Sequence, residues 1–111
     1  MSSDGILQKL HSKVDIEIVK LLLSVIPNSW YSIRLEVEYK IMPNGHEGFP
    51  MNISNSEGHS DIVIPPDELY SKICEHSNIF KQYGKQWKKL TYNVFFDTDK
   101  EDWEFKIDYE Y

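Results

Sequence analysis

The sequence predicts an α+β fold in which an antiparallel β-sheet of about five strands is covered on one face by two helices. Two segments repeat apolar residues at steps of three and four, which indicates amphipathic helices. Four others alternate apolar and polar residues, which is typical of half-buried strands. The connections between the predicted strands are short and favour antiparallel pairing. Because such a sheet has one apolar face, the helices are expected to cover it.

The first half of the chain predicts one helix and three strands. The helical pattern covers 7–25, and a proline two positions later ends it. The clearest alternation follows at 31–41. A second strand is expected at 49–53, where Pro50 indicates a sheet edge or a bulge. The short apolar run 62–64 is expected to be the third strand.

The second half predicts one helix and a hairpin. Two prolines and two acids at 65–68 suit the first turn of a helix, and Gly84 is a suitable end for it. Alternating strands are expected at 90–96 and 103–109, joined by a loop at 97–102. The predicted order is therefore α-β-β-β-α-β-β.

The composition indicates one soluble domain covering residues 1–111. A chain of 111 residues with 41% hydrophobic residues is long enough for one core. Its formal net charge of −6 repels nucleic acid and anionic membranes and attracts basic partners. The single cysteine excludes an internal disulfide, and the longest apolar run is far short of the ~20 residues that cross a bilayer. A cytoplasmic protein without membrane contact is expected.

No motif in the sequence predicts an enzyme, a metal site or a cofactor. None of the four histidines has a partner at helical metal-binding spacing, and Cys74 and His76 point about 200° apart on their helix. A nucleophile elbow and a phosphate-binding glycine loop are absent from the sequence. His59 and Asp61 could contact a metal with two side chains, but a solvated turn is the simpler interpretation.

Acidic residues gather near the C-terminus, at Asp97, Asp99, Glu101, Asp102, Glu104, Asp108 and Glu110, against only two lysines. Their spacing fails the EF-hand pattern, which needs glycine at position six and glutamate at position twelve. Two interpretations stay open. These acids form either a solvated hairpin or an acidic docking surface for a basic partner.

Two aromatic residues are candidates for binding. On the polar face of the predicted sheet Phe95 is the one aromatic residue, and it is either an interface anchor or covered by the loop 42–49. Trp87 lies among Lys81, Lys85, Lys88 and Lys89, a combination that can bind single-stranded nucleic acid. The net negative charge argues against that second role.

Three short motifs resemble those of one known family. Residues 87–94 read Trp-Lys-Lys-Leu-Thr-Tyr-Asn-Val, residues 103–109 read Trp-Glu-Phe-Lys-Ile-Asp-Tyr, and residues 26–30 read Ile-Pro-Asn-Ser-Trp. Over residues ~13 to 111 the chain resembles the YezG-like family of bacterial immunity proteins, whose members share these motifs and the same order of elements. The segment between the first strands and the second helix is shorter here than is usual in that family.

The resemblance implies an immunity protein, or antitoxin, that binds the toxin domain of a polymorphic or contact-dependent toxin system in the cytoplasm. It implies no catalytic residue and no cofactor. A nuclease is the expected class of toxin, because nuclease active sites are basic and an acidic inhibitor complements them. The candidate toxin-binding residues are Phe95, Asp97, Asp99, Glu101, Asp102, Glu104, Asp108 and Glu110. The alternatives are a protein-binding adaptor unrelated to toxins, a small enzyme that uses buried carboxylates or His59, and a nucleic-acid-binding module.

Overall fold

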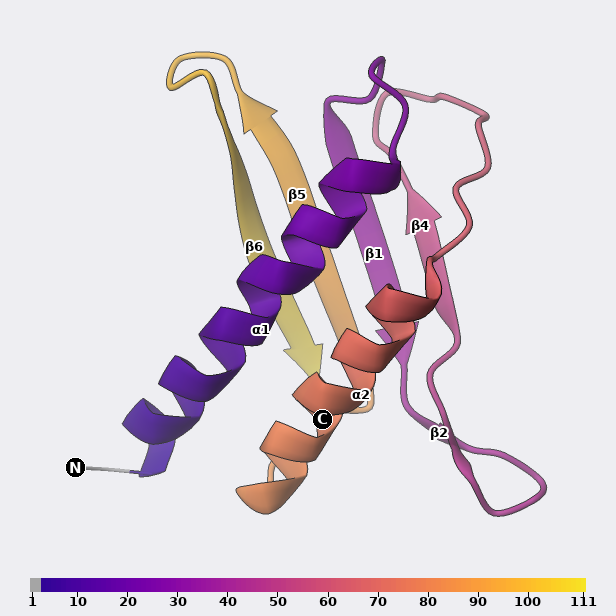
Figure 1. Cartoon of the computed structure of the whole chain (residues 1–111), viewed down its shortest axis with the longest axis vertical. Helices are drawn as coiled ribbons and strands as arrows, with labels where there is room; N and C mark the ends of the chain where they lie inside the picture. The colour runs from indigo at the N-terminus through magenta and orange to yellow at the C-terminus, as the bar shows by residue number, and fades with distance from the viewer. Residues whose placement is uncertain (1–2) are drawn as a thin grey trace.

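The computed structural model describes residues 3–111, and it confirms the α+β class. The elements are α1 (Ser3–Val25), β1 (Ser32–Glu38), β2 (Lys40–Ile41), β3 (Glu47–Gly48), β4 (Met51–Ser54), α2 (Asp67–Gln82), β5 (Lys89–Asp97) and β6 (Asp102–Glu110). The main sheet is antiparallel, with strand order β4-β1-β5-β6. Figure 1 shows both helices lying side by side on one face of this sheet, as the sequence predicts.

The sequence prediction is wrong in two details of the sheet. The main sheet has four strands instead of about five, because the long alternating segment divides at Tyr39 and its end forms the separate hairpin β2–β3. The predicted strand at 62–64 is absent. A hydrogen-bonded turn before this segment and two prolines after it keep the chain away from the edge of β4 (Figure 1). Pro50 lies directly before β4, which is an edge strand as predicted.

The core forms between the helices and the inner face of the sheet. Ile33, Leu35 and Val37 alternate inward on β1, and Tyr92 and Val94 on β5 do the same. Their helix partners on the other side of the core are Val14, Ile18 and Leu22 of α1 and Leu69, Ile73 and Phe80 of α2. Since both helices lie on this side, the opposite face of the sheet is open.

Candidate protein-binding surface

The open face of the sheet carries the polar residues of each strand. Register pairs Phe95 of β5 with Ser32 of β1 on one side and with Glu104 of β6 on the other. Below that row, Asn93 lies between Arg34 and Lys106. The alternation that predicts the polar face therefore holds along β1, β5 and β6, whereas Lys40, near the end of the predicted strand 31–41, lies in the separate hairpin.

Most of the open face is balanced in charge. Arg34 Nε lies 2.9 Å from Glu36 Oε1, and Lys89 Nζ lies 3.2 Å from Glu36 Oε2. Lys40 pairs with Glu38 at 3.0 Å. These pairs leave no excess of negative charge along the middle of β1, so this region does not distinguish a basic partner from others.

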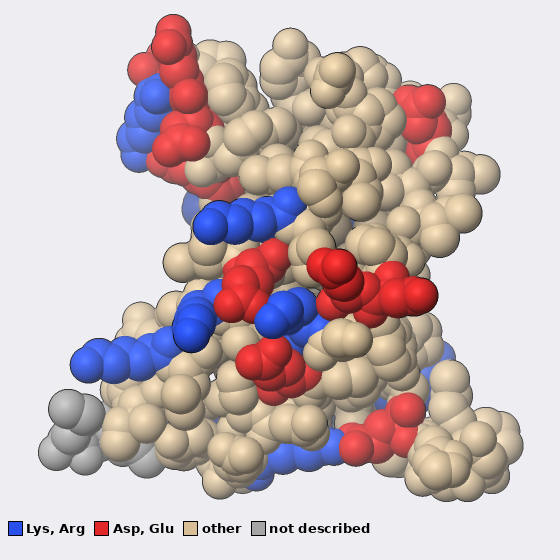
Figure 2. Space-filling model, viewed as in Figure 1, with Lys and Arg blue, Asp and Glu red and all other residues tan. Residues whose placement is uncertain are grey.

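Negative charge is concentrated instead at the turn between β5 and β6. Residues 97–104, called the acidic tip from here on, contain five acids and one lysine, and Lys100 is held by Glu104 at 2.6 Å. Figure 2 shows this tip as the red and blue cluster at the upper left. Asp97 and Asp102 lie opposite one another in register, and like charges in that position destabilise a strand pair. The tip is thus the most acidic part of the sheet.

The acids of the tip differ in their local roles. Asp97 Oδ1 accepts hydrogen bonds from the backbone N–H groups of Asp99 and Lys100, at 2.9 and 3.2 Å, and so stabilises the turn. Asp102 Oδ1 accepts from the Trp103 N–H. Within the described residues, the side chains of Asp99 and Glu101 have no hydrogen-bond or ion-pair partner, and both are exposed. Those two are therefore the acids most available to a ligand.

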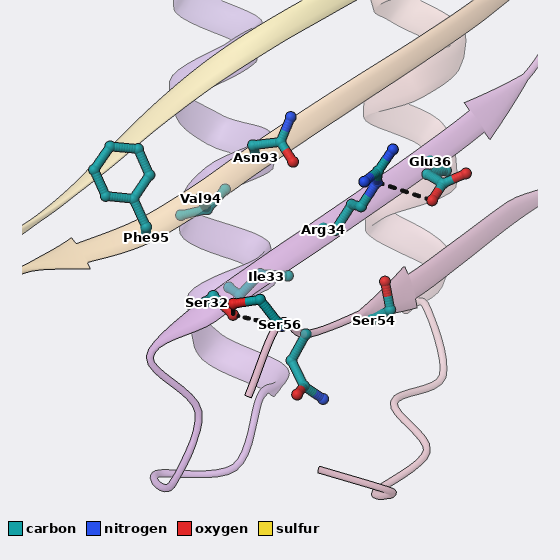
Figure 3. Close-up of a pocket in the computed structure, with 10 residues that line it drawn as sticks. Ser32, Ile33, Arg34, Glu36, Ser54, Ser56, Asn93, Val94 and Phe95 are labelled. Atoms are coloured by element: carbon teal, nitrogen blue, oxygen red, sulfur yellow. Dashed lines mark hydrogen bonds and ion pairs between the residues drawn. The ribbon is translucent and has the colours of Figure 1, made fainter. Parts of the chain in front are cut away.

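Phe95 borders a hollow of about 440 Å³ on the open face. Figure 3 views this face with the helices behind the sheet, and the ring of Phe95 lies to one side of Asn93 and Arg34. Ser32, Ser54 and residues 55–56 complete the wall of the hollow. The loop 42–49 does not cover Phe95, because it belongs to the β2–β3 hairpin at the opposite end of the sheet (Figure 1). Phe95 is half-buried and reachable from the open face.

The structure separates the predicted contact residues into two groups. Phe95 and the five acids of the tip gather at one end of the sheet. Asp108 and Glu110 lie along β6 toward its other end, and Glu110 is roughly 27 Å from Asp102 at the rise of an extended strand. Asp108 accepts a hydrogen bond from Asn93 at 3.3 Å. A small ligand cannot contact both groups at once, whereas a protein surface can.

A buried polar network joins both helices to the sheet. Asp15 on α1 and His76 on α2 are 2% and 0% exposed. Tyr92 donates to Asp15 Oδ1 at 2.5 Å, and His11 Nδ1 lies 2.8 Å from Asp15 Oδ2. Trp87 Nε1 donates to His76 Nδ1 at 3.1 Å. Local sequence patterns do not predict this network. His11 and Asp15 nevertheless have the i,i+4 spacing of a helical pair, so the prediction that no histidine has a partner at helical spacing is wrong.

The protonation of the network follows from its donors. Trp87 N–H can only donate, so His76 Nδ1 carries the lone pair and Nε2 carries the proton. That Nε2 lies 3.1 Å from Asp15 Oδ1, off the line of a regular hydrogen bond. Burial by itself would raise the pKa of the Asp15 carboxyl, but the contacts with His76, Tyr92 and His11 lower it below its ordinary value of 3.8. Asp15 is therefore a buried, ionised carboxylate at neutral pH.

The same three residues, His11, Asp15 and His76, offer ligand atoms that lie within 4.8 Å of one another. Imidazole and carboxylate groups are common ligands of transition metals. Here the Trp87 hydrogen bond keeps the proton on His76 Nε2, and Tyr92 occupies one oxygen of Asp15. This donor set fits a hydrogen-bonded network better than a metal ion.

The tryptophan within the lysine cluster, Trp87, is not at the protein surface. Trp87 is fully buried, so its ring is not available to stack on a base. Lys81 forms an ion pair with Glu47, and Lys89 forms one with Glu36. The charge of these two lysines is therefore already balanced within the chain. These contacts favour a structural role for this part of the molecule.

His59 and Asp61 both contact Trp30. These contacts account for the positions of the two side chains without a metal ion. The His59 ring stacks on the Trp30 ring at 6.3 Å between centroids, with 7° between the planes. Its Nε2 lies 3.1 Å from the Ser29 carbonyl oxygen. Trp30 Nε1 donates to Asp61 Oδ2 at 3.4 Å.

The single cysteine, Cys74 on α2, is not activated as a nucleophile. Burial raises the pKa of its thiol, which disfavours the nucleophilic thiolate.

No protein-family model matches the chain, and no curated protein is similar to it. Within residues 3–111, no helix combines the length and the apolar character that a membrane crossing requires.

Proposed function

We propose that this chain is an immunity protein that neutralises a cognate toxin domain in the cytoplasm by forming a tight stoichiometric complex. The observation that carries the proposal is the acidic tip, where Asp99 and Glu101 are exposed and unpaired among the described residues. The half-buried Phe95 lies next to it on the open face and supplies an apolar anchor. The resemblance to YezG-like immunity proteins in the motifs at 26–30, 87–94 and 103–109 supports the same assignment.

The physical argument concerns charge. Asp97 and Asp102 oppose one another in the strand register, which costs stability in the free chain. A basic partner would relieve that repulsion on binding and would also be steered to the tip by long-range attraction. The active site of a nuclease has this basic character, since it must hold phosphates. A nuclease is accordingly the proposed class of toxin.

The alternatives have weaker support. A nucleic-acid-binding module would need Trp87 at the surface, and it is buried. A small enzyme would need an accessible reactive group, whereas Asp15 is enclosed by its own donors and His59 is stacked on Trp30. A protein-binding adaptor unrelated to toxins would use the same acidic tip, and only the identity of the partner separates it from an immunity protein.

The test uses the toxin domain encoded beside this chain in its genome. Wild-type chain should protect cells at equimolar expression and bind the purified domain. Reversing Asp99 and Glu101 to lysine should raise Kd roughly tenfold or more, mainly through slower association, and should weaken the salt dependence. Adding Asp102→Lys and Glu104→Lys should increase the loss. The double variant Glu38→Lys, Glu75→Lys changes the net charge by the same amount as the first pair, at positions far from the tip, and it serves as the control.

Two outcomes would contradict the proposal in different ways. If the tip variants bind as well as the wild type while the fold is intact, the contact surface is wrong. If the wild type neither binds nor protects, the immunity function is wrong. If it protects at far less than equimolar amounts, stoichiometric neutralisation is wrong and an enzymatic role gains support.

A further inference from the structure

The segment between β4 and α2 presents two isoleucines to solvent. Ile62 is 90% exposed and Ile64 is 79% exposed, while Val63 between them is half-buried. The segment has no strand partner, and in Figure 1 it forms the outer part of the loop at the upper right. Single exposed apolar residues are common on protein surfaces. Two nearly bare β-branched side chains at alternate positions of one loop are not.

This loop is held firmly at its base. The side chain of Asn55 donates to the His59 carbonyl and accepts from the His59 N–H, both at 3.0 Å. The buried ring of Trp30 stacks on His59 and donates to Asp61, the residue before Ile62. These contacts order the chain up to the exposed pair.

The other end of the loop is stiff as well. Two prolines, 65 and 66, follow Ile64 and restrict the backbone before α2 begins at Asp67. Ile62 and Ile64 are thus displayed on an ordered scaffold. A partner that buries them would pay little additional ordering entropy, which is the condition under which exposed apolar side chains contribute most to affinity.

The charge around the pair identifies the kind of partner. Residues 55–68 contain Glu57, Asp61, Asp67 and Glu68, all exposed, and no lysine or arginine. Figure 2 likewise shows red but no blue atoms at the upper right. A complementary surface is an apolar pocket bordered by lysine or arginine. A second copy of this chain would bring Glu57 and Asp61 against their own counterparts in a symmetric contact, so self-association is disfavoured.

The position of the loop matches that of the acidic tip. β4 ends and β5 ends at the same end of the sheet (Figure 1). Three strand spacings, roughly 14 Å, separate β4 from β6 within the sheet, and the loop lies just beyond the β4 edge (Figure 1). One protein surface of ordinary size can therefore contact both the loop and the tip.

We propose that Ile62 and Ile64 insert into an apolar pocket, bordered by basic residues, on the same toxin domain that contacts the acidic tip. This inference rests on the proposed function. It assigns the two features different roles. The tip accelerates association through charge, and the isoleucine pair slows dissociation through buried apolar area.

The experiment measures binding of the genomically adjacent toxin domain to the double variant Ile62→Ser, Ile64→Ser. Kd should rise about 100-fold through faster dissociation, since two isoleucine side chains lose their burial. The melting temperature should stay unchanged, because both side chains are exposed in the free chain. Ile41→Ser is the matched control, since Ile41 is 61% exposed on the hairpin at the other end of the sheet, and it should bind as the wild type does.

Three other outcomes would contradict the anchor role, the proposed function or the identity of the partner. If wild type binds and the double variant binds within a few-fold of it, the isoleucine pair is not an anchor, and the proposed function stands. If the wild type does not bind the toxin domain, the proposed function fails and this inference fails with it. If sedimentation shows a wild-type dimer that the double variant abolishes, the occupant is a second copy and the assignment to the toxin domain is wrong.

Discussion

Replacing Tyr92 with phenylalanine removes one oxygen atom from the buried network and should destabilise the chain by about 2 kcal/mol. The Tyr92 hydroxyl donates to the ionised Asp15 at 2.5 Å, and both groups are buried. Hydrogen bonds to charged groups contribute about 1.5–3 kcal/mol, and the carboxylate would lose a donor that water cannot replace. For a chain of this size the loss corresponds to a melting temperature lower by roughly 8 °C.

Tyr109→Phe provides the matched control for that measurement. Its hydroxyl oxygen is also buried but has no hydrogen-bond partner among the described residues. Removing it should change the unfolding free energy by less than about 0.5 kcal/mol or should stabilise the chain. Urea unfolding followed by tryptophan fluorescence at neutral pH measures both variants. The reasoning is refuted if Tyr92→Phe matches the wild type, or if the two variants lose the same stability.

Three further predictions concern the network and the loop. The pKa of Asp15 is lowered in the folded chain, so its contribution to stability is present above its ordinary pKa of 3.8 and is lost as the pH falls through the folded value. Asp15→Asn should therefore flatten the fall of the unfolding free energy at acid pH, measured in urea titrations. A pH profile equal to that of the wild type would contradict this role of Asp15. Zinc should move the melting temperature of the wild type by less than about 1 °C, and a larger rise that His76→Ala removes would instead establish a metal site. Desolvation raises the pKa of the Glu57 carboxyl, but the hydrogen bonds that it accepts from Ser32 and from the Tyr31 N–H outweigh this effect and lower the pKa to about 2. Glu57→Gln should make the Tyr31 amide exchange its hydrogen roughly tenfold faster, and equal exchange rates would show that Glu57 does not order this turn.

The predicted surface residues were identified because strand periodicity needs only local sequence. Alternation along 90–96 and 103–109 assigns each side chain to one face, and the helices then select which face is covered. This alternation predicts that Phe95 and Glu104 both face away from the helices, and the register pairs them as neighbours. The separation of Glu110 from the tip could also be inferred from strand length. Their function as contacts stays a proposal.

The buried network and the isoleucine loop depend on long-range contacts that local patterns do not encode. Tyr92 meets Asp15 across 77 positions of the chain, and a carboxylate within a helical stripe looks solvated until its donors are in place. The run 62–64 has the composition of a buried strand. The contacts of Trp30 with His59 and Asp61 direct it away from the sheet edge.

By itself, the sequence determined the α+β class, the two helices, the strands β1, β4, β5 and β6, and most of the apolar side chains that face the core, since each follows from hydrophobic period and from proline and glycine positions. Only the tertiary structure decided the strand order, the partners of Asp15 and the exposure of Ile62 and Ile64. The physical reason is that these features depend on packing between distant segments, where a few hydrogen bonds from another element determine whether the same residue is buried, paired or left in solvent.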